Sequence, residues 1–127
     1  MRILLIEDDK EISEMLSSYL MAENFEIVCA ADGQKACEAF DTGSYGIVLL
    51  DLMIPQITGM EVMKYIRQKS TVPIIIISAK DSDSDKTLGL GLGASGVFAV
   101  RRHILQISSL SFIIRQVVII ALFYGIL

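Results

Sequence analysis

Carboxylates and one hydroxyl stand directly after three apolar runs of the sequence. Glu7 and Asp8 follow the first run, Asp51 follows the second, and Ser78 follows the third. Carboxylates gathered at one place repel one another, and burying them is costly unless a proton or a cation compensates their charge. A divalent cation with oxygen ligands is the simplest compensation, and Mg²⁺ suits such a set. A carboxylate beside Mg²⁺ can also attack a phosphorus centre and form an acyl phosphate.

The residues after Asp51 narrow the choice of chemistry. Pro55 and Gly59 stiffen and turn a loop that can present a backbone carbonyl to a metal. The hydroxyl of Ser78 can donate a hydrogen bond to a phosphoryl oxygen. The alternative is that these acids only cap helices, and for Asp9 taken alone we favour that interpretation. The combination of acids and hydroxyl at strand ends favours phosphoryl transfer.

Alternating strands and helices would position these side chains. Apolar runs predict strands over 3–6, 25–30, 46–50, 72–77 and 96–100, and helical spacing predicts helices over 9–22, 33–40, 60–69 and 83–92. This alternation is typical of an α/β fold with a parallel sheet and helices on both faces. Because the carboxyl ends of parallel strands lie along one edge, we expect the acids and Ser78 to converge there.

The order and spacing of these motifs resemble the receiver domain of two-component response regulators. The resemblance is carried by the acid pair Glu7-Asp8, by D-x-x-x-P-x-x-x-G from Asp51 to Gly59, and by Ser78 followed by alanine. It covers about residues 1–94, and the winged-helix class of these regulators is the most similar. It implies a flavodoxin-like doubly wound sheet in the order 2-1-3-4-5.

The resemblance also implies a role for each site residue. Asp51 is similar to the phospho-acceptor, which receives its phosphoryl group from a sensor histidine kinase. Asp8 and Asp51 would bind Mg²⁺ together with the backbone carbonyl of Met53, and Glu7 would act through water. Ser78 resembles the switch hydroxyl that moves toward the phosphoryl group.

The last part of the chain departs from the family pattern. The family has a lysine, followed by proline, at the end of strand five. Here Val100 or, with a one-residue gap, Arg101 falls at that position, and no proline follows. Arginine presents a wider fork than lysine, so Arg101 is a candidate and the lysine role is assigned to no residue. We expect a receiver domain over 1–100 and an atypical apolar segment over 101–127, with the fifth strand and the last helix atypical.

Charge separates the two parts of the chain as well. All 15 acidic residues fall at or before Asp85, whereas the 42 residues from Lys86 onward hold 4 basic residues and no acid. Three explanations compete for the apolar segment: out-of-frame translation that truncates the protein, a membrane anchor, or a helix that pairs in a homodimer. Arg115 and its polar neighbours oppose the anchor. The sudden loss of motifs favours the first explanation.

Together these features predict a cytoplasmic receiver that is not an enzyme, with impaired coupling to output and no direct binding of nucleic acid. The acidic first part argues against nucleic acid, and Cys29 and Cys37, which show no metal-type spacing, are interpreted as core residues in a reducing compartment. One alternative is a metal-dependent phosphohydrolase with an aspartyl-phosphate intermediate, although Met53 stands where such enzymes carry a second aspartate. Another is a degenerate receiver that acts only as an interaction module.

Overall fold

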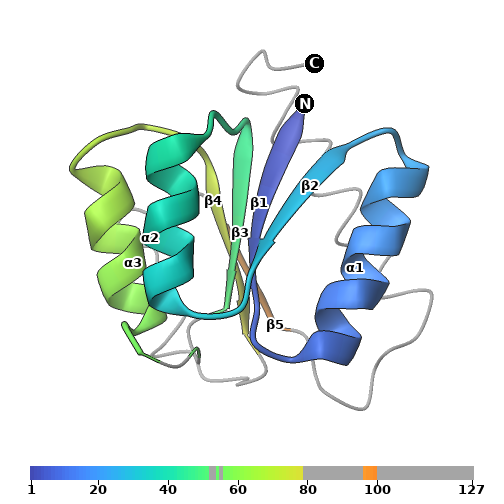
Figure 1. Ribbon diagram of the computed structural model, residues 1–127, viewed down its shortest axis with the longest axis horizontal. Helices are drawn as coiled ribbons and strands as arrows, with labels where there is room; N and C mark the ends of the chain where they lie inside the picture. The colour runs from blue at the N-terminus through green and yellow to red at the C-terminus, as the bar shows by residue number, and fades with distance from the viewer. Residues whose placement is uncertain (52–53, 55, 79–95, 100–127) are drawn as a thin grey trace.

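A parallel sheet with helices on both faces forms the described part of the chain (Figure 1). The computed structural model describes residues 1–51, 54, 56–78 and 96–99, with the backbone alone for 78 and 96–99. The strands are β1 (Arg2–Ile6), β2 (Glu26–Ala30), β3 (Ile47–Asp51), β4 (Ile74–Ser78) and β5 (Gly96–Ala99). Their order is β2-β1-β3-β4-β5, and neighbouring strands are parallel. The expected flavodoxin-like α/β sheet is confirmed.

Within the described residues, three helices cover the sheet. Helix α1 (Lys10–Ala22) lies on one face, and helices α2 (Gly33–Thr42) and α3 (Gly59–Arg67) lie side by side on the other (Figure 1). Alternate residues of each central strand therefore belong to different cores. Ile3 and Leu5 pack with the inner stripe of α1, whereas Leu4 and Ile6 pack with α2 and α3. Because both faces are covered, β1, β3 and β4 are apolar almost throughout.

Side-chain caps start all three helices. Asp9 caps α1, Asp32 caps α2 and Thr58 caps α3. The side chain of Asp9 accepts from two amides of the first turn, and those of Asp32 and Thr58 accept from one each. A cap satisfies donors that have no partner within the helix. The interpretation of Asp9 as a helix cap is confirmed.

The observed boundaries differ from the expected ones by a few residues. Helix α2 continues to Thr42, and α3 runs from Gly59 to Arg67. Strand β4 begins after Pro73, whose nitrogen has no hydrogen to donate to a ladder. Strand β3 includes Asp51, so the acid is the last residue of the strand itself.

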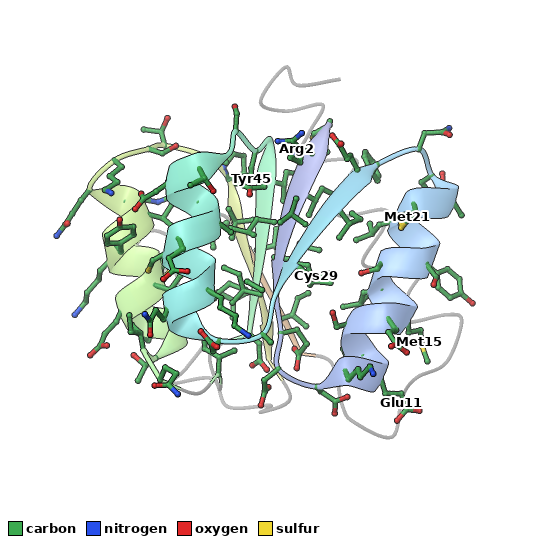
Figure 2. The ribbon with its side chains drawn as sticks, in the orientation of Figure 1. Arg2, Glu11, Met15, Met21, Cys29 and Tyr45 are labelled. Atoms are coloured by element: carbon green, nitrogen blue, oxygen red, sulfur yellow. The ribbon has the colours of Figure 1, made fainter. Side chains whose placement is uncertain are left out.

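The cysteines correct one expectation. Both are free thiols, but Cys29 is exposed and does not belong to a core (Figure 2). Strand β2 lies at the edge of the sheet, which leaves this side chain beside α1, where its sulfur lies 3.2 Å from the hydroxyl oxygen of Ser17.

Several expectations fall on other parts of the chain. The helix expected over 83–92, the candidate Arg101 and the apolar segment 101–127 lie outside the described residues. In the described part of the chain, no helix combines the length and the apolar character needed to cross a bilayer.

Candidate metal and phosphoryl-acceptor site

Two neighbouring strands bring the acidic residues together at one edge of the sheet. Ile6 of β1 lies opposite Leu50 of β3, so Glu7 and Asp51 follow at matching positions. Asp8 is the next residue along the chain. Each of the three side chains offers a carboxylate oxygen, and these oxygens all lie within 4.8 Å of one another. The expected convergence of positions 7, 8 and 51 is therefore observed.

The three carboxylates differ in burial. Glu7 is 7% exposed and Asp51 is 8% exposed, whereas Asp8 lies at the surface. The backbone nitrogen of Asp9 donates to Oε1 of Glu7 at 3.0 Å, which orients that carboxyl toward the site. The side chain of Asp9 itself is used by the cap of α1 and stands outside the group of three.

Burial and neighbouring charge make the site a strong acceptor of positive charge. Burial, followed by the charge of Asp51 and a smaller contribution from Asp8, raises the pKa of Glu7 from 4.5 to about 8. The pKa of Glu7 is raised because its ionised form loses hydration and lies beside other anions. A proton or a cation relieves both costs. The donor set consists of hard carboxylate oxygens, so it fits Mg²⁺.

The strand next to β3 carries the expected hydroxyl residue. Ile77 of β4 lies opposite Asp51, and Ser78 is the following residue and the end of that strand. The backbone of Ser78 thus ends at the same edge of the sheet, while its hydroxyl lies outside the described atoms. Met53 also lies outside the described residues. The roles of Ser78 and of the Met53 carbonyl stay predictions.

One feature of the site was not foreseen from the sequence. Gln56 lies in the connection between Asp51 and α3 and has a φ of 72°. Residues other than glycine seldom adopt this left-handed backbone conformation. A neighbouring proline signals a turn, but it does not indicate which residue takes the unusual conformation.

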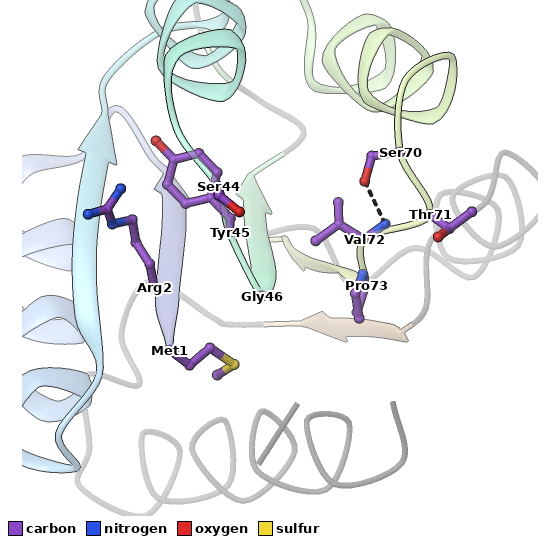
Figure 3. Close-up of a pocket in the computed structure, with 9 residues that line it drawn as sticks. All are labelled: Met1, Arg2, Ser44, Tyr45, Gly46, Ser70, Thr71, Val72 and Pro73. Carbon is purple, nitrogen blue, oxygen red and sulfur yellow. Dashed lines mark hydrogen bonds between the residues drawn. The ribbon is translucent and has the colours of Figure 1, made fainter. Parts of the chain in front are cut away.

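A pocket of about 540 Å³ lies at the opposite edge of the sheet (Figure 3). Its lining comes from the residues that precede or start β1, β3 and β4, together with the turn after α3: Met1, Arg2, Ser44, Tyr45, Gly46, Ser70, Thr71, Val72 and Pro73. None of these nine residues carries a carboxylate. The pocket is thus separated from the acidic group by the length of the strands.

Comparisons with known proteins agree with this geometry. The response regulator receiver domain family matches residues 3–100. The uncharacterized transcriptional regulatory protein YcbL of Bacillus subtilis is 47% identical over 96 residues, which are 76% of this chain and 42% of that protein. The chain thus spans less than half the length of the curated relatives it matches.

Solved structures of response regulators resemble the fold of this chain. The BeF3-activated receiver domain of Klebsiella pneumoniae RstA superposes with a TM-score of 0.80 at 28% identity, covering 91% of this chain and 97% of that one. The response regulator TrrA of Thermotoga maritima, in complex with Mg²⁺-BeF, gives 0.76 at 28% identity, covering 91% and 96%. By its sheet order, its acidic edge and these matches, the chain belongs to the family of response regulator receiver domains.

Proposed function

We propose that this chain accepts a phosphoryl group on Asp51 in a Mg²⁺-dependent reaction, with a sensor histidine kinase as donor. The observation that carries the proposal is the group of carboxylate oxygens from Glu7, Asp8 and Asp51, all within 4.8 Å of one another. The relatives RstA and TrrA support it, since their structures are described as BeF3-activated and as a complex with Mg²⁺-BeF.

Asp51 is the nucleophile in this proposal. A carboxylate oxygen of Asp51 forms a bond to phosphorus while the bond between phosphorus and the imidazole nitrogen of the donor breaks. The displaced histidine leaves as a neutral imidazole after it takes up a proton. Asp51 is 8% exposed, so little water competes around it.

Asp8 and Asp51 would hold the cation, with the carbonyl of Met53, and Glu7 would act through water. When bound, Mg²⁺ neutralises charge on the transferred group. Because its pKa is raised to about 8, the Glu7 carboxyl, which accepts from the amide of Asp9 at 3.0 Å, holds a proton at neutral pH when no cation is present. The hydroxyl of Ser78 would donate to a phosphoryl oxygen after transfer.

The wider biological role is part of the same proposal. The chain is proposed to act as a receiver in the cytoplasm. Up to Asp85 it has 15 acidic and 7 basic residues, and this negative charge argues against direct binding of nucleic acid. Impaired output, truncation and a homodimer depend on the residues from 100 onward, and these stay predictions. A phosphohydrolase is not favoured, because Met53 would supply no general acid for a leaving group.

Labelling with acetyl phosphate tests the proposal. The wild type and its Asp51→Asn and Asp41→Asn variants are incubated with acetyl phosphate and Mg²⁺, then separated by phosphate-affinity electrophoresis. Asp41 is the matched control, since it is an exposed aspartate on α2 outside the acidic group. We expect retarded bands for the wild type and Asp41→Asn, and none for Asp51→Asn or after chelation of Mg²⁺. Equal labelling of Asp51→Asn, or no labelling of the wild type, would overturn the proposal.

A further inference from the structure

A close contact joins the first turn of α2 to the connection that follows Asp51. Gly33 is the first residue of α2 and is buried. A Cβ added to Gly33 would lie 2.2 Å from the carbonyl oxygen of Ile57 and 2.7 Å from its Cβ. Real Cβ atoms do not approach other atoms so closely, so any side chain at position 33 would force a shift. Steric crowding therefore requires glycine at this position.

The connection that makes this contact leads directly from the proposed acceptor. Ile57 lies six residues after Asp51 and two before α3. Ile54 is 8% exposed, and Ile57 is partly buried against the core under α2 and α3. Gln56, between them, has a φ of 72°. A strained residue of this kind persists only where the surrounding structure holds it.

Helix α2 has little freedom to move away from the connection. Ala36, one turn after Gly33, is fully buried in the core. At the far end of the helix, Nζ of Lys69 donates to Oδ1 of Asp41 at 2.7 Å, and the Tyr65 hydroxyl donates to the other oxygen of Asp41. These contacts hold α2 against α3. A side chain at position 33 would therefore displace the connection and not the helix.

We infer that Gly33 is a positioning residue for Asp51. By letting the first turn of α2 lie against Ile57, it fixes the far end of the connection that begins at Asp51. The inference rests on the proposed function. Phosphoryl transfer needs the nucleophile, the cation ligands and the donor in one geometry, and small displacements slow it steeply. A side chain at position 33 therefore slows the labelling of Asp51 by more than the loss of folded protein accounts for.

The test compares two glycines at opposite ends of the same helix. Gly43→Ala is the matched control, because its added Cβ meets only the end of the Tyr45 side chain, at 2.6 Å from the hydroxyl oxygen. Each variant is assayed for the rate of labelling by acetyl phosphate, for the Mg²⁺ dissociation constant by calorimetry, and for unfolding in urea. We expect Gly33→Ala to label about tenfold or more slowly, and Gly43→Ala to stay within about twofold of the wild type, once the rates are corrected for the folded fraction.

A second variant protects the test against misfolding of Gly33→Ala. Ile57→Ala leaves Gly33 in place and creates no clash. It keeps the Cβ and the carbonyl that meet Gly33, but it removes the rest of the side chain, which packs the connection against the core under α2 and α3. We expect it also to label more slowly and to bind Mg²⁺ more weakly than Gly43→Ala. The inference is overturned if the wild type labels while Gly33→Ala and Ile57→Ala label at the Gly43→Ala rate. If Gly33→Ala does not fold, a wild-type rate in Ile57→Ala overturns it equally. Absence of labelling in the wild type overturns the proposed function, and the inference with it.

Discussion

Replacement of Glu7 by glutamine should stabilise the metal-free protein at neutral pH. Glu7 is 7% exposed and lies beside Asp51. Burial first, and then the charge of Asp51, raise its pKa from 4.5 to about 8. Because the folded-state pKa lies above the unfolded value, the stabilising contribution of this group is complete below pH 4.5 and is lost as the pH rises through about 8.

The size of this effect follows from the same two pKa values. At pH 7 a carboxyl that ionises near 4.5 when unfolded and near 8 when folded lowers the free energy of unfolding by about 3 kcal/mol. Glutamine cannot ionise, yet its amide oxygen can still accept the hydrogen bond from Asp9. We therefore expect Glu7→Gln to gain about 3 kcal/mol over the wild type at pH 7, equivalent to about 10 °C in Tm.

The assay is urea unfolding followed by far-ultraviolet circular dichroism, with a chelator present, at pH 5 and pH 8. The wild type should lose stability between these pH values, and Glu7→Gln should lose much less. Glu11→Gln is the matched control, since Glu11 projects from the first turn of α1 into solvent (Figure 2). It should keep the wild-type pH dependence. Parallel pH dependences for the wild type and Glu7→Gln would refute the reasoning.

Mg²⁺ supplies a second arm of the same experiment. A ligand that binds only the folded state raises the free energy of unfolding in proportion to the logarithm of its concentration over Kd. Bound protons compete with the cation, so stabilisation of the wild type by Mg²⁺ should be larger at pH 8 than at pH 5. Equal stabilisation by Mg²⁺ at both pH values would contradict the conclusion that Glu7 is protonated at pH 5 and competes with the cation.

Three further substitutions test the supports around the site. Asp9→Ala removes a cap whose Oδ1 accepts from two first-turn amides at 3.0 and 3.2 Å, and thermal unfolding should show a loss of about 1 kcal/mol. Arg67→Met removes a donor to the carbonyl of Val72 at 2.6 Å, so urea unfolding should show a loss of about 1–3 kcal/mol; an unchanged midpoint would mean that water replaces the guanidinium. Lys69→Met removes the hydrogen bond that is the main cause of the lowered pKa of Asp41, so a carbon-detected NMR titration should find that pKa moved back toward its usual range.

Local patterns in the chain were sufficient for most of the fold. The run 3–6 is apolar at every position, and such runs between amphipathic helices indicate strands covered on both faces. The position of an acid directly after a strand was also enough to predict that Glu7, Asp8 and Asp51 converge, because parallel strands end at one edge. The strand order came from the family resemblance, since strand patterns alone do not specify which strands are neighbours.

The sequence did not predict the exposure of Cys29 or the end of β3 at Asp51, because both depend on neighbouring strands. Cys29 is small and lies in an apolar run, but it is exposed because β2 is an edge strand. Asp51 was placed after its strand and lies within it, since pairing with Ile77 continues the ladder by one residue. The exposure of a strand residue and the last residue of a strand depend on which strands pair with it, and the sequence of one segment does not specify that pairing.

Two properties of the site were decided by the tertiary structure alone. The first is the contrast between Glu7, which is buried, and Asp8, which is exposed. The pKa of Glu7 is raised because packing around the strand end excludes water from its carboxyl. The second is the contact between Gly33 and Ile57, residues 24 positions apart. Residue types and spacing determine where the charges fall along the chain. Distances between elements, set by how two helices pack on one sheet face, determine which charges lose their water and which backbones touch.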